Sequence, residues 1–380
     1  MKKKYIIFSI VTLVLLITFV TSFNYFKTTN TYVENNSNNQ TKITKGISMN
    51  LEQTAGAGDY KTVTRSSWPT EGYNFNAELS RCENGSTLSW DDTKKAVIVS
   101  GNLSDKCYVY FDLARFDETC DGSTLACRIA KQYTGTQGEN SLYYHDSTLT
   151  NGAGDNSYRY AGASNNVNNY ICLGSDATTC PDANLFRIIG VFGDQTKVIR
   201  AKSVGDKEWD TNDSNTWSTS SLNTYLNGEY LTSLGTLADK IATTTWKVGG
   251  GSTTYLYDVP KTAYQYEVGS SASTTTYDAK IGLMYVSDYG FAADQSGWTT
   301  KLSSYNSNKS KNWLNTGKYI EWTLSRNSDN TDNAFGVIST GYVDNYNVTK
   351  SYVVRPSFNL ESSVKYVSGS GSMSGPVRVN

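Results

Sequence analysis

The chain has 380 residues, with 34 Lys or Arg against 35 Asp or Glu, and 18% of its residues are charged while 13% are aromatic. This nearly neutral, aromatic-rich composition excludes a disordered chain and a basic nucleic-acid-binding protein, so no nucleic acid partner is expected. At roughly 150 residues per domain, the length predicts about two folded domains.

The N-terminus predicts a membrane anchor. Lys residues at positions 2–4 precede an uncharged run over residues 5–23, which is long enough to cross a bilayer as a helix. Because the positive charges precede the run, the N-terminus should stay cytoplasmic and the remainder should be exported. We therefore expect a single-pass protein of the cell membrane, with its cytoplasmic tail and signal anchor in residues 1–23 and an extracellular body. A cleaved signal peptide is the alternative, since Val20 and Ser22 form a small-residue cleavage site.

A stalk and a small module are expected next. Residues 24–58 consist mainly of Asn, Thr, Ser, Gln and Lys, a composition that predicts a polar stalk without a core. Residues 59–116 predict a small β module, because three runs of β-branched and aromatic residues, at 88–90, 96–99 and 107–111, are separated by turn-forming segments.

All six cysteines follow the predicted membrane segment, which indicates disulfides in an oxidising compartment. They form three sequence-local pairs, although spacing alone leaves other pairings open. The pairs are Cys82 with Cys107, Cys120 with Cys127, and Cys172 with Cys180. A zinc site is not expected, because no C-x-x-C motif occurs and His145 is the only histidine.

The remaining residues, 117–380, predict a mixed domain. Amphipathic periodicity and capping residues favour helices, and runs of β-branched residues favour strands. The expected helices cover 125–132, 222–230 and 234–241, with Ser123 and Ser221 as caps of the first two, and the expected strands cover 185–192, 196–200, 281–286, 335–338 and 352–354. Since helices and strands do not alternate regularly, we expect an α+β domain.

No catalytic constellation is recognisable. A Ser-His-Asp or Cys-His hydrolase would have to use His145, which neither a G-x-S-x-G motif nor an unpaired cysteine accompanies. A glycosidase needs two facing carboxylates, and most Asp residues here adjoin turn-forming residues instead. We therefore expect no enzyme and no catalytic residues.

Two segments concentrate oxygen donors that calcium prefers, namely residues 210–215 and 329–333. Neither carries the Gly and Glu that an EF-hand loop requires, and polar turns explain both segments as well. Calcium therefore stands as the only candidate cofactor, and no metal ligands are assigned.

Aromatic residues gather in the last third of the chain. Trp313 and Trp322 are expected in the core, whereas Tyr342 and Tyr346 lie in a turn-rich segment and fit either the core or an exposed platform for a sugar or a partner protein.

Several motifs resemble those of known proteins. The segments 68–73, 82–85, 88–91 and 106–111 resemble a short module of membrane-anchored surface proteins from gut Firmicutes and their relatives. The later segments resemble the uncharacterised domain that usually follows this module; they are Asn184–Gly190, Lys280–Gly290, Trp322–Ser325, Val354–Leu360 and Ser368–Gly371.

The end of that domain is similar to C-type-lectin-like folds. A Trp-containing strand, a polar stretch and then Arg355-Pro356 follow one another here as they do there. The resemblance implies that the stretch 326–350 presents the ligand surface and that Arg355 and Pro356 are structural. Arg326 stands where a Pro often follows the Trp strand, and the signatures of calcium-dependent sugar binding are absent. The ligand-binding residues expected on this resemblance are Asn327, Asp329, Asn330, Asp332, Tyr342 and Tyr346.

Together these observations predict a membrane-anchored extracellular binding or adhesion protein of a bacterial cell surface. Its expected partners are the membrane, through residues 5–23, and a glycan, host, cell-wall or surface-protein ligand. A cell-surface hydrolase acting on glycans or peptidoglycan, and an architectural protein without a ligand site, are the alternatives.

Overall fold

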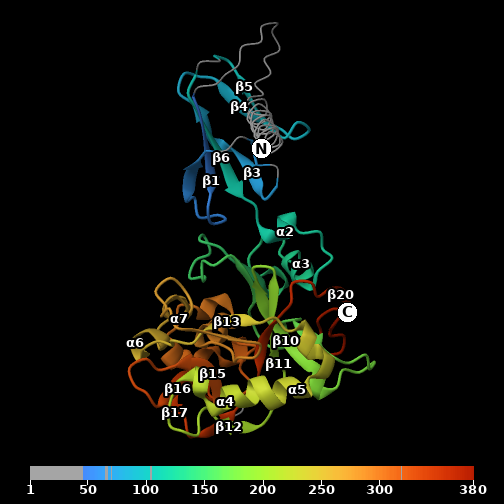
Figure 1. Cartoon of the computed structure of the whole chain (residues 1–380), viewed down its shortest axis with the longest axis vertical. Helices are drawn as coiled ribbons and strands as arrows, with labels where there is room; N and C mark the ends of the chain where they lie inside the picture. Colours follow the sequence, from blue (N-terminus) through green and yellow to red (C-terminus); the bar gives the residue numbers. More distant parts are fainter. Residues whose placement is uncertain (1–45, 65–66, 70, 103–104, 318) are drawn as a thin grey trace, which may run out of the picture. The chain divides into compact units, whose positions relative to one another are not determined.

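The computed structural model describes residues 46–64, 67–69, 71–102, 105–317 and 319–380. These residues divide into two compact units, the first ending at Arg115 and the second running from Phe116 to Asn380 (Figure 1). The sequence predicts this boundary between residues 116 and 117.

The predicted membrane segment, 5–23, and the first part of the predicted stalk, 24–45, lie outside the described residues. Within the described ranges, no helix is both long enough and apolar enough to cross a bilayer. The described residues of unit 1 form strands alone, whereas unit 2 combines many strands with short helices, so the α+β class is confirmed for the described residues.

Unit 1 is built on a four-stranded sheet with the order β2-β1-β6-β3, to which a β4–β5 hairpin is added (Figure 1). The hairpin and β6 contain the three strands predicted in this module. The strands are β1 (Ile47–Glu52), β2 (Tyr60–Val63), β3 (Tyr73–Cys82), β4 (Thr87–Asp91), β5 (Ala96–Ser100) and β6 (Cys107–Leu113).

Strand β1 corrects the predicted extent of the stalk, because residues 47–52 fall within the range 24–58 and yet belong to the sheet. β1 pairs antiparallel with β2 and parallel with β6. Its residues Met49 and Leu51 are buried in the unit 1 core. The polar composition of this region gives no local signal for a strand. The main partner of β1 is β6, which is distant in the sequence and meets β1 only in the folded chain.

The disulfide Cys82–Cys107 joins the end of β3 to the start of β6, where the two cysteines face each other in register. It closes a connection of 25 residues that carries the β4–β5 hairpin. Beside it, Asp105 is buried and accepts hydrogen bonds from the backbone N–H groups of Asn84 and Ser86. The disulfide and this turn together fix the hairpin to the sheet.

Unit 2 contains a sheet of eight strands with the order β19-β11-β10-β9-β21-β20, in which β8 pairs with both β10 and β7. The predicted strands over 185–192 and 196–200 form its central hairpin. The strands are β7 (Leu142–His145), β8 (Ser157–Tyr160), β9 (Tyr170–Cys172), β10 (Leu185–Phe192), β11 (Gln195–Arg200), β19 (Ser357–Leu360), β20 (Tyr366–Ser368) and β21 (Val377–Val379).

A second, five-stranded sheet has the order β12-β18-β15-β16-β17, and a separate hairpin consists of β13 and β14. The strands are β12 (Asp206–Glu208), β13 (Thr244–Lys247), β14 (Thr276–Ala279), β15 (Glu321–Arg326), β16 (Asn333–Val337), β17 (Val343–Asn347) and β18 (Ser351–Val353). The helices are α2 (Phe116–Thr119), α3 (Leu125–Ala130), α4 (Ser221–Tyr225), α5 (Leu231–Ser233), α6 (Thr253–Leu256), α7 (Pro260–Glu267) and α8 (Val286–Phe291).

The caps of two predicted helices lie one residue from their predicted positions. Thr124 caps α3 through the backbone N–H of Cys127, in place of Ser123. Ser220 caps α4 through Asn223, in place of Ser221. The helix expected over 234–241 is a 3-10 segment, Gly235–Lys240.

The strand predicted over 281–286 is wrong. Only one isolated bridge, Gly282 to Ser357, forms there, and α8 begins at Val286. The side chain of Asp288 accepts a hydrogen bond from the backbone N–H of Tyr285 and so starts the helix. A short buried apolar run fits a strand or a buried helix equally well, and this capping carboxylate decides between them.

The core of unit 2 contains the aromatic residues predicted there. Trp313 and Trp322 are 2% and 0% exposed. Arg355 is also buried, where its Nε donates to Glu321 Oε1 at 2.7 Å and its Nη2 to the carbonyl oxygen of Leu314. The structural role expected for Arg355 agrees with this ion pair.

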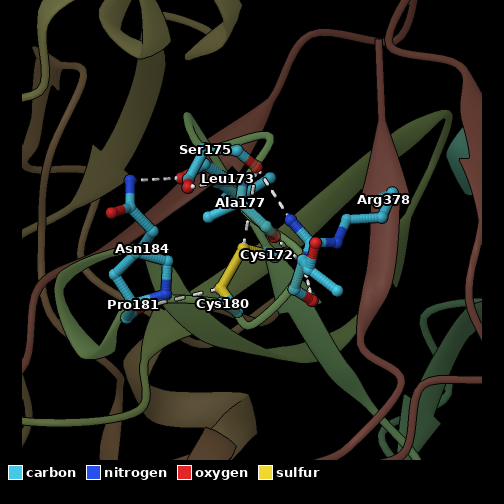
Figure 2. Close-up of a disulfide and its surroundings, with 9 residues drawn as sticks. Cys172, Leu173, Ser175, Ala177, Cys180, Pro181, Asn184 and Arg378 are labelled. Carbon is cyan, nitrogen blue, oxygen red and sulfur yellow. Dashed lines mark hydrogen bonds between the residues drawn. A yellow bond between two sulfur atoms is a disulfide. The ribbon is translucent and has the colours of Figure 1, made fainter.

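The other two disulfides, Cys120–Cys127 and Cys172–Cys180, also join the expected cysteines, and no free cysteine occurs among the described residues. Figure 2 shows that the Cys172–Cys180 loop lies against Arg378 of β21. The guanidinium of Arg378 donates to the carbonyl oxygens of Ser175 and Ala177, each at 2.8 Å. This loop therefore anchors the C-terminal strand to β9.

Removing the disulfide of unit 1 should destabilise that unit. Replacing Cys82 and Cys107 by Ser should lower its free energy of unfolding by about 3.5 kcal/mol, because the unfolded chain regains the entropy of the opened loop. Hydrogen exchange measured by mass spectrometry should show faster exchange in β3 and β6. The double Cys172→Ser, Cys180→Ser variant is the control and should leave exchange in unit 1 unchanged; unaltered exchange in the first variant would contradict the stabilising role.

Candidate functional site

The turn between β15 and β16 contains four of the six predicted ligand-binding residues. The side chains of two of them, Asn327 and Asn330, form hydrogen bonds within the turn. Asn327 is 3% exposed, and its side-chain oxygen accepts from the backbone N–H of Asp329 at 3.0 Å. The side-chain oxygen of Asn330 accepts from the backbone N–H of Asn333 at 3.1 Å. Asp329 is exposed and Asp332 is half-buried, so these two keep their carboxylates nearer to solvent.

The two segments considered for calcium lie side by side. The side-chain nitrogen of Asn215 donates to the backbone carbonyl oxygens of Asn327, Asn330 and Asn333, at 2.9, 3.0 and 2.8 Å. An uncharged amide therefore occupies the point where these three carbonyl groups converge. Across the described ranges, no group of three or more His, Cys, Asp or Glu side chains is placed to hold a metal ion.

The six predicted residues do not form one continuous surface. β16 pairs with β17 so that Asn333 faces Asn347 and Val337 faces Val343. Tyr342 precedes β17, at the Val337 end of this hairpin, whereas the β15–β16 turn lies at the Asn333 end. The length of β16 thus separates Tyr342 from the four turn residues.

Tyr346 belongs instead to a row of aromatic residues on the five-stranded sheet. Its ring centroid lies 5.2 Å from that of Tyr352, in an edge-to-face arrangement. The ring of Tyr352 lies 5.0 Å from that of Trp322, which is fully buried. Both tyrosines are half-buried, and Trp322 forms the floor beneath Tyr352.

Lys207 and Tyr225 continue this row. Lys207 on β12 faces Tyr352 on β18 in the strand register, which places their side chains on the same face of the sheet. The Lys207 ammonium nitrogen lies 3.7 Å from the ring centroid of Tyr225, at the end of α4. We call Tyr225, Lys207, Tyr352 and Tyr346 the tyrosine stripe.

Tyr346 lies over Gly336 of β16. A Cβ atom at this position would lie 2.9 Å from Ile320 and 3.1 Å from the carbonyl oxygen of Glu321, so these close approaches favour glycine here. The ring of Tyr346 would be 3.5 Å from that Cβ atom, an ordinary contact distance.

The phenol groups of the stripe are uncharged at neutral pH. Burial raises the pKa of Tyr225, Tyr346 and Tyr352 above the ordinary value of 10. Each phenol therefore keeps its proton and can donate a hydrogen bond to a ligand.

The stripe combines residues from four separate parts of the chain, and of these only Tyr346 is predicted from the sequence as a ligand-binding residue. Tyr352 was expected only as part of a strand, and Lys207 and Tyr225 carried no signal of binding. The register of β12 with β18 is what aligns them, and no local pattern reveals that register.

A buried cluster of charges is the second polar feature of unit 2. Asp288 Oδ2 accepts from Lys197 Nζ at 2.5 Å, and Arg159 Nη1 lies 3.6 Å from Asp288 Oδ1. Arg159 also donates to Asp155 at 2.6 Å, and despite the opposing effect of burial it holds the pKa of Asp155 below the ordinary value. Both carboxylates are therefore paired with cations.

Glu267 is a buried carboxylate at the start of α8. It is 2% exposed and accepts from the backbone N–H groups of Val286 and Ser287, each at 2.9 Å, and from the hydroxyl of Ser325. Burial raises the pKa of Glu267 to about 7, although its hydrogen bonds favour the charged form. The Glu267 carboxylate is therefore only partly ionised near neutral pH.

His145 is fully buried in contact with Phe291 and Trp298. Its Nδ1 accepts from the backbone N–H of Ala153 at 3.1 Å, and burial lowers the pKa of His145 to about 3. The ring is therefore neutral and enclosed, a position that suits packing rather than proton transfer with a solvent-borne substrate.

The titration of Glu267 predicts a pH dependence of stability. Its pKa in the folded chain, about 7, lies above the ordinary 4.5, so the folded chain binds this proton more tightly than the unfolded chain does. The contribution is fully present below about pH 4.5 and is lost as the pH rises through 7, a total change of roughly 3 kcal/mol. Glu267→Gln should flatten this decline, as measured by urea unfolding between pH 5 and 8.

Glu229→Gln, at an exposed position, is the control for that measurement and should keep the wild-type slope. An identical slope in Glu267→Gln and the wild type would show that Glu267 does not titrate in this range.

Comparison with known proteins identifies one domain. The profile of a domain of unknown function, DUF6273, matches residues 193–362, so the chain contains such a domain. No curated protein and no solved structure matches the chain. The matched range includes every residue of the tyrosine stripe, and the stripe therefore lies within the DUF6273 domain.

Proposed function

We propose that the protein is a membrane-anchored extracellular binding protein that holds a glycan on the tyrosine stripe. The observation that carries this proposal is the row of half-buried tyrosines over Trp322 on one face of the five-stranded sheet. The three disulfides support an oxidising, extracellular location, and the uncharged run over residues 5–23 supports the anchor.

The chemistry of the stripe suits a sugar ligand. Tyrosine rings give a sugar ring flat apolar surface, and their phenol groups supply hydrogen bonds at the edge. Since Tyr346 and Tyr352 are already held by neighbouring rings, little side-chain entropy is lost when a ligand binds.

The likeness to C-type-lectin-like folds belongs to this proposal. It directs attention to the stretch 326–350, of which Tyr346 is part of the stripe. Asp329, Asp332 and Tyr342 remain candidates for contacts at its margin, whereas Asn327 and Asn330 act through the shape of the turn. A bacterial surface protein of the Firmicutes type is the proposed biological setting.

The hydrolase alternative has less support from the geometry. Asp155 and Asp288 hold Arg159 and Lys197, and Glu267 holds the first turn of α8. Each of these carboxylates already has a partner that explains its position, and the enclosed His145 offers no general base to solvent.

Removing rings from the stripe should weaken binding. The purified full-length chain would be tested against a panel of glycans, mucins and cell-wall polysaccharides. For a ligand so found, Tyr352→Ala and Tyr346→Ala should each lower the affinity about tenfold, because each removes stacking surface. Unfolding temperatures of the variants would show that each is folded.

Tyr319→Ala is the matched control, since Tyr319 is 76% exposed and lies outside the stripe. Full affinity in both stripe variants would place the ligand elsewhere. No binding to any member of the panel would reject the glycan and favour a protein partner or an architectural role.

The same assay tests calcium. Binding would be measured with calcium and again with a chelator. Loss of affinity on chelation would make calcium a cofactor of binding, and retained affinity would reject calcium as a cofactor of binding.

A further inference from the structure

Two tyrosines on consecutive helices of unit 2 form a close face-to-face stack. Tyr255 lies in α6 and Tyr266 in the last turn of α7, and their ring centroids are 3.5 Å apart with an angle of 4° between the ring planes. Aromatic pairs in proteins prefer edge-to-face or offset arrangements, with centroids about 4.5–7 Å apart. The stacked pair Tyr144 and Tyr158, by comparison, has its centroids 4.7 Å apart. Ordinary packing therefore does not account for the stack of Tyr255 on Tyr266.

This pair lies outside the core of unit 2. Both residues are half-buried, and neither belongs to a hydrophobic cluster of the described residues or packs against one. Their neighbours in the two helices are anchored, because Leu256 is fully buried and Glu267 accepts hydrogen bonds from the first turn of α8. The two rings therefore reach the surface from helices that buried residues hold in place.

The two phenol groups lie at the same end of the stack. A hydrogen bond with Tyr255 raises the pKa of Tyr266 above the ordinary value of 10, so the two hydroxyl groups are adjacent. In parallel rings whose hydroxyl groups are adjacent, the ortho carbons face each other across the stack. These are the carbons on which an oxidised phenol carries much of its unpaired electron, so the atoms that couple in tyrosine oxidation already face one another.

We propose that Tyr255 and Tyr266 form an oxidative crosslinking site, at which hydrogen peroxide and a peroxidase join the two rings as dityrosine. The crosslink adds a covalent connection between α6 and α7 to the three disulfides described above. An oxidising extracellular compartment, which those disulfides support, suits this chemistry. The proposal does not depend on glycan binding.

The reaction needs no reagent other than the peroxide and the enzyme. Each phenol loses one electron and one proton, and the two radicals form one carbon–carbon bond between their ortho carbons, across the stack. The two ortho hydrogens then transfer through solvent to the oxygens, which restores two aromatic phenols. One molecule of hydrogen peroxide takes up the two electrons and two protons and leaves as two molecules of water. Because the rings are already in place, this pair should couple faster than tyrosines that must first collide.

The test treats the purified full-length chain with hydrogen peroxide and a peroxidase. The treated chain should gain the blue fluorescence of dityrosine and lose the mass of two hydrogen atoms. Trypsin cleaves after Lys261, which lies between the two tyrosines, so the crosslink should appear as one joined peptide that contains both Tyr255 and Tyr266. The yield of this peptide should stay constant when the chain is diluted, because the coupling occurs within one molecule.

Three variants locate the reaction. Tyr255→Phe and Tyr266→Phe should each abolish the joined peptide, because each removes one phenol and keeps the ring that stacks. Tyr319→Phe is the matched control. Tyr319 is 76% exposed and would react first if exposure alone decided the coupling, so its loss should leave the joined peptide at the wild-type yield.

Each other outcome would overturn the proposal. A treated chain without dityrosine would do so, as would dityrosine that persists undiminished in Tyr255→Phe and Tyr266→Phe. A yield of the joined peptide that falls on dilution, or in Tyr319→Phe, would assign the coupling to collisions between molecules and reject the built site. Glycan binding is measured separately, so the proposed function stands or fails independently of these results.

Discussion

The buried carboxylate of Asp288 is the constraint on which the arrangement of unit 2 depends. A charge removed from water must be paired, and here Lys197 of β11 and Arg159 of β8 supply the opposite charges while the backbone of Tyr285 donates to the same carboxylate. These contacts join the eight-stranded sheet to the start of α8. Glu267 then connects the end of α7 to the same helix start and, through Ser325, to β15.

β15 connects these buried contacts to the opposite face of its sheet. The inward side chains of Glu321 and Ser325 bind Arg355 and Glu267, and they fix the height and rotation of the strand. Trp322, which points the other way, is thereby held against Tyr352, and its indole nitrogen donates to the carbonyl oxygen of Lys207 at 3.0 Å. The floor of the tyrosine stripe is therefore held in place, because a buried ion pair and a buried hydrogen bond anchor the far side of the strand.

Secondary structure was predictable where the pattern is local. The hairpin β10–β11, the strands β4 to β6 and the three disulfides were expected from short runs of residues and from cysteine spacing. The prediction was wrong at residues 281–286, where a buried apolar run begins a helix, and incomplete at β1, whose main partner β6 is distant in the sequence. Both depend on partners that a window of neighbouring residues does not contain.

The candidate site also combines features that are visible in the sequence with features that depend on contacts between distant segments. The sequence by itself determined the neutral, aromatic-rich composition, the local spacing of the cysteines, the uncharged N-terminal run and the polar turn after Trp322, because each depends on residue type and on close spacing. Only the tertiary structure decided that Asn327 and Asn330 form hydrogen bonds within the turn, and that Tyr346, Tyr352, Lys207 and Tyr225 lie in one row. The physical reason is that a binding surface is made by strand register and by burial, which join distant segments and so have no local signature in the chain.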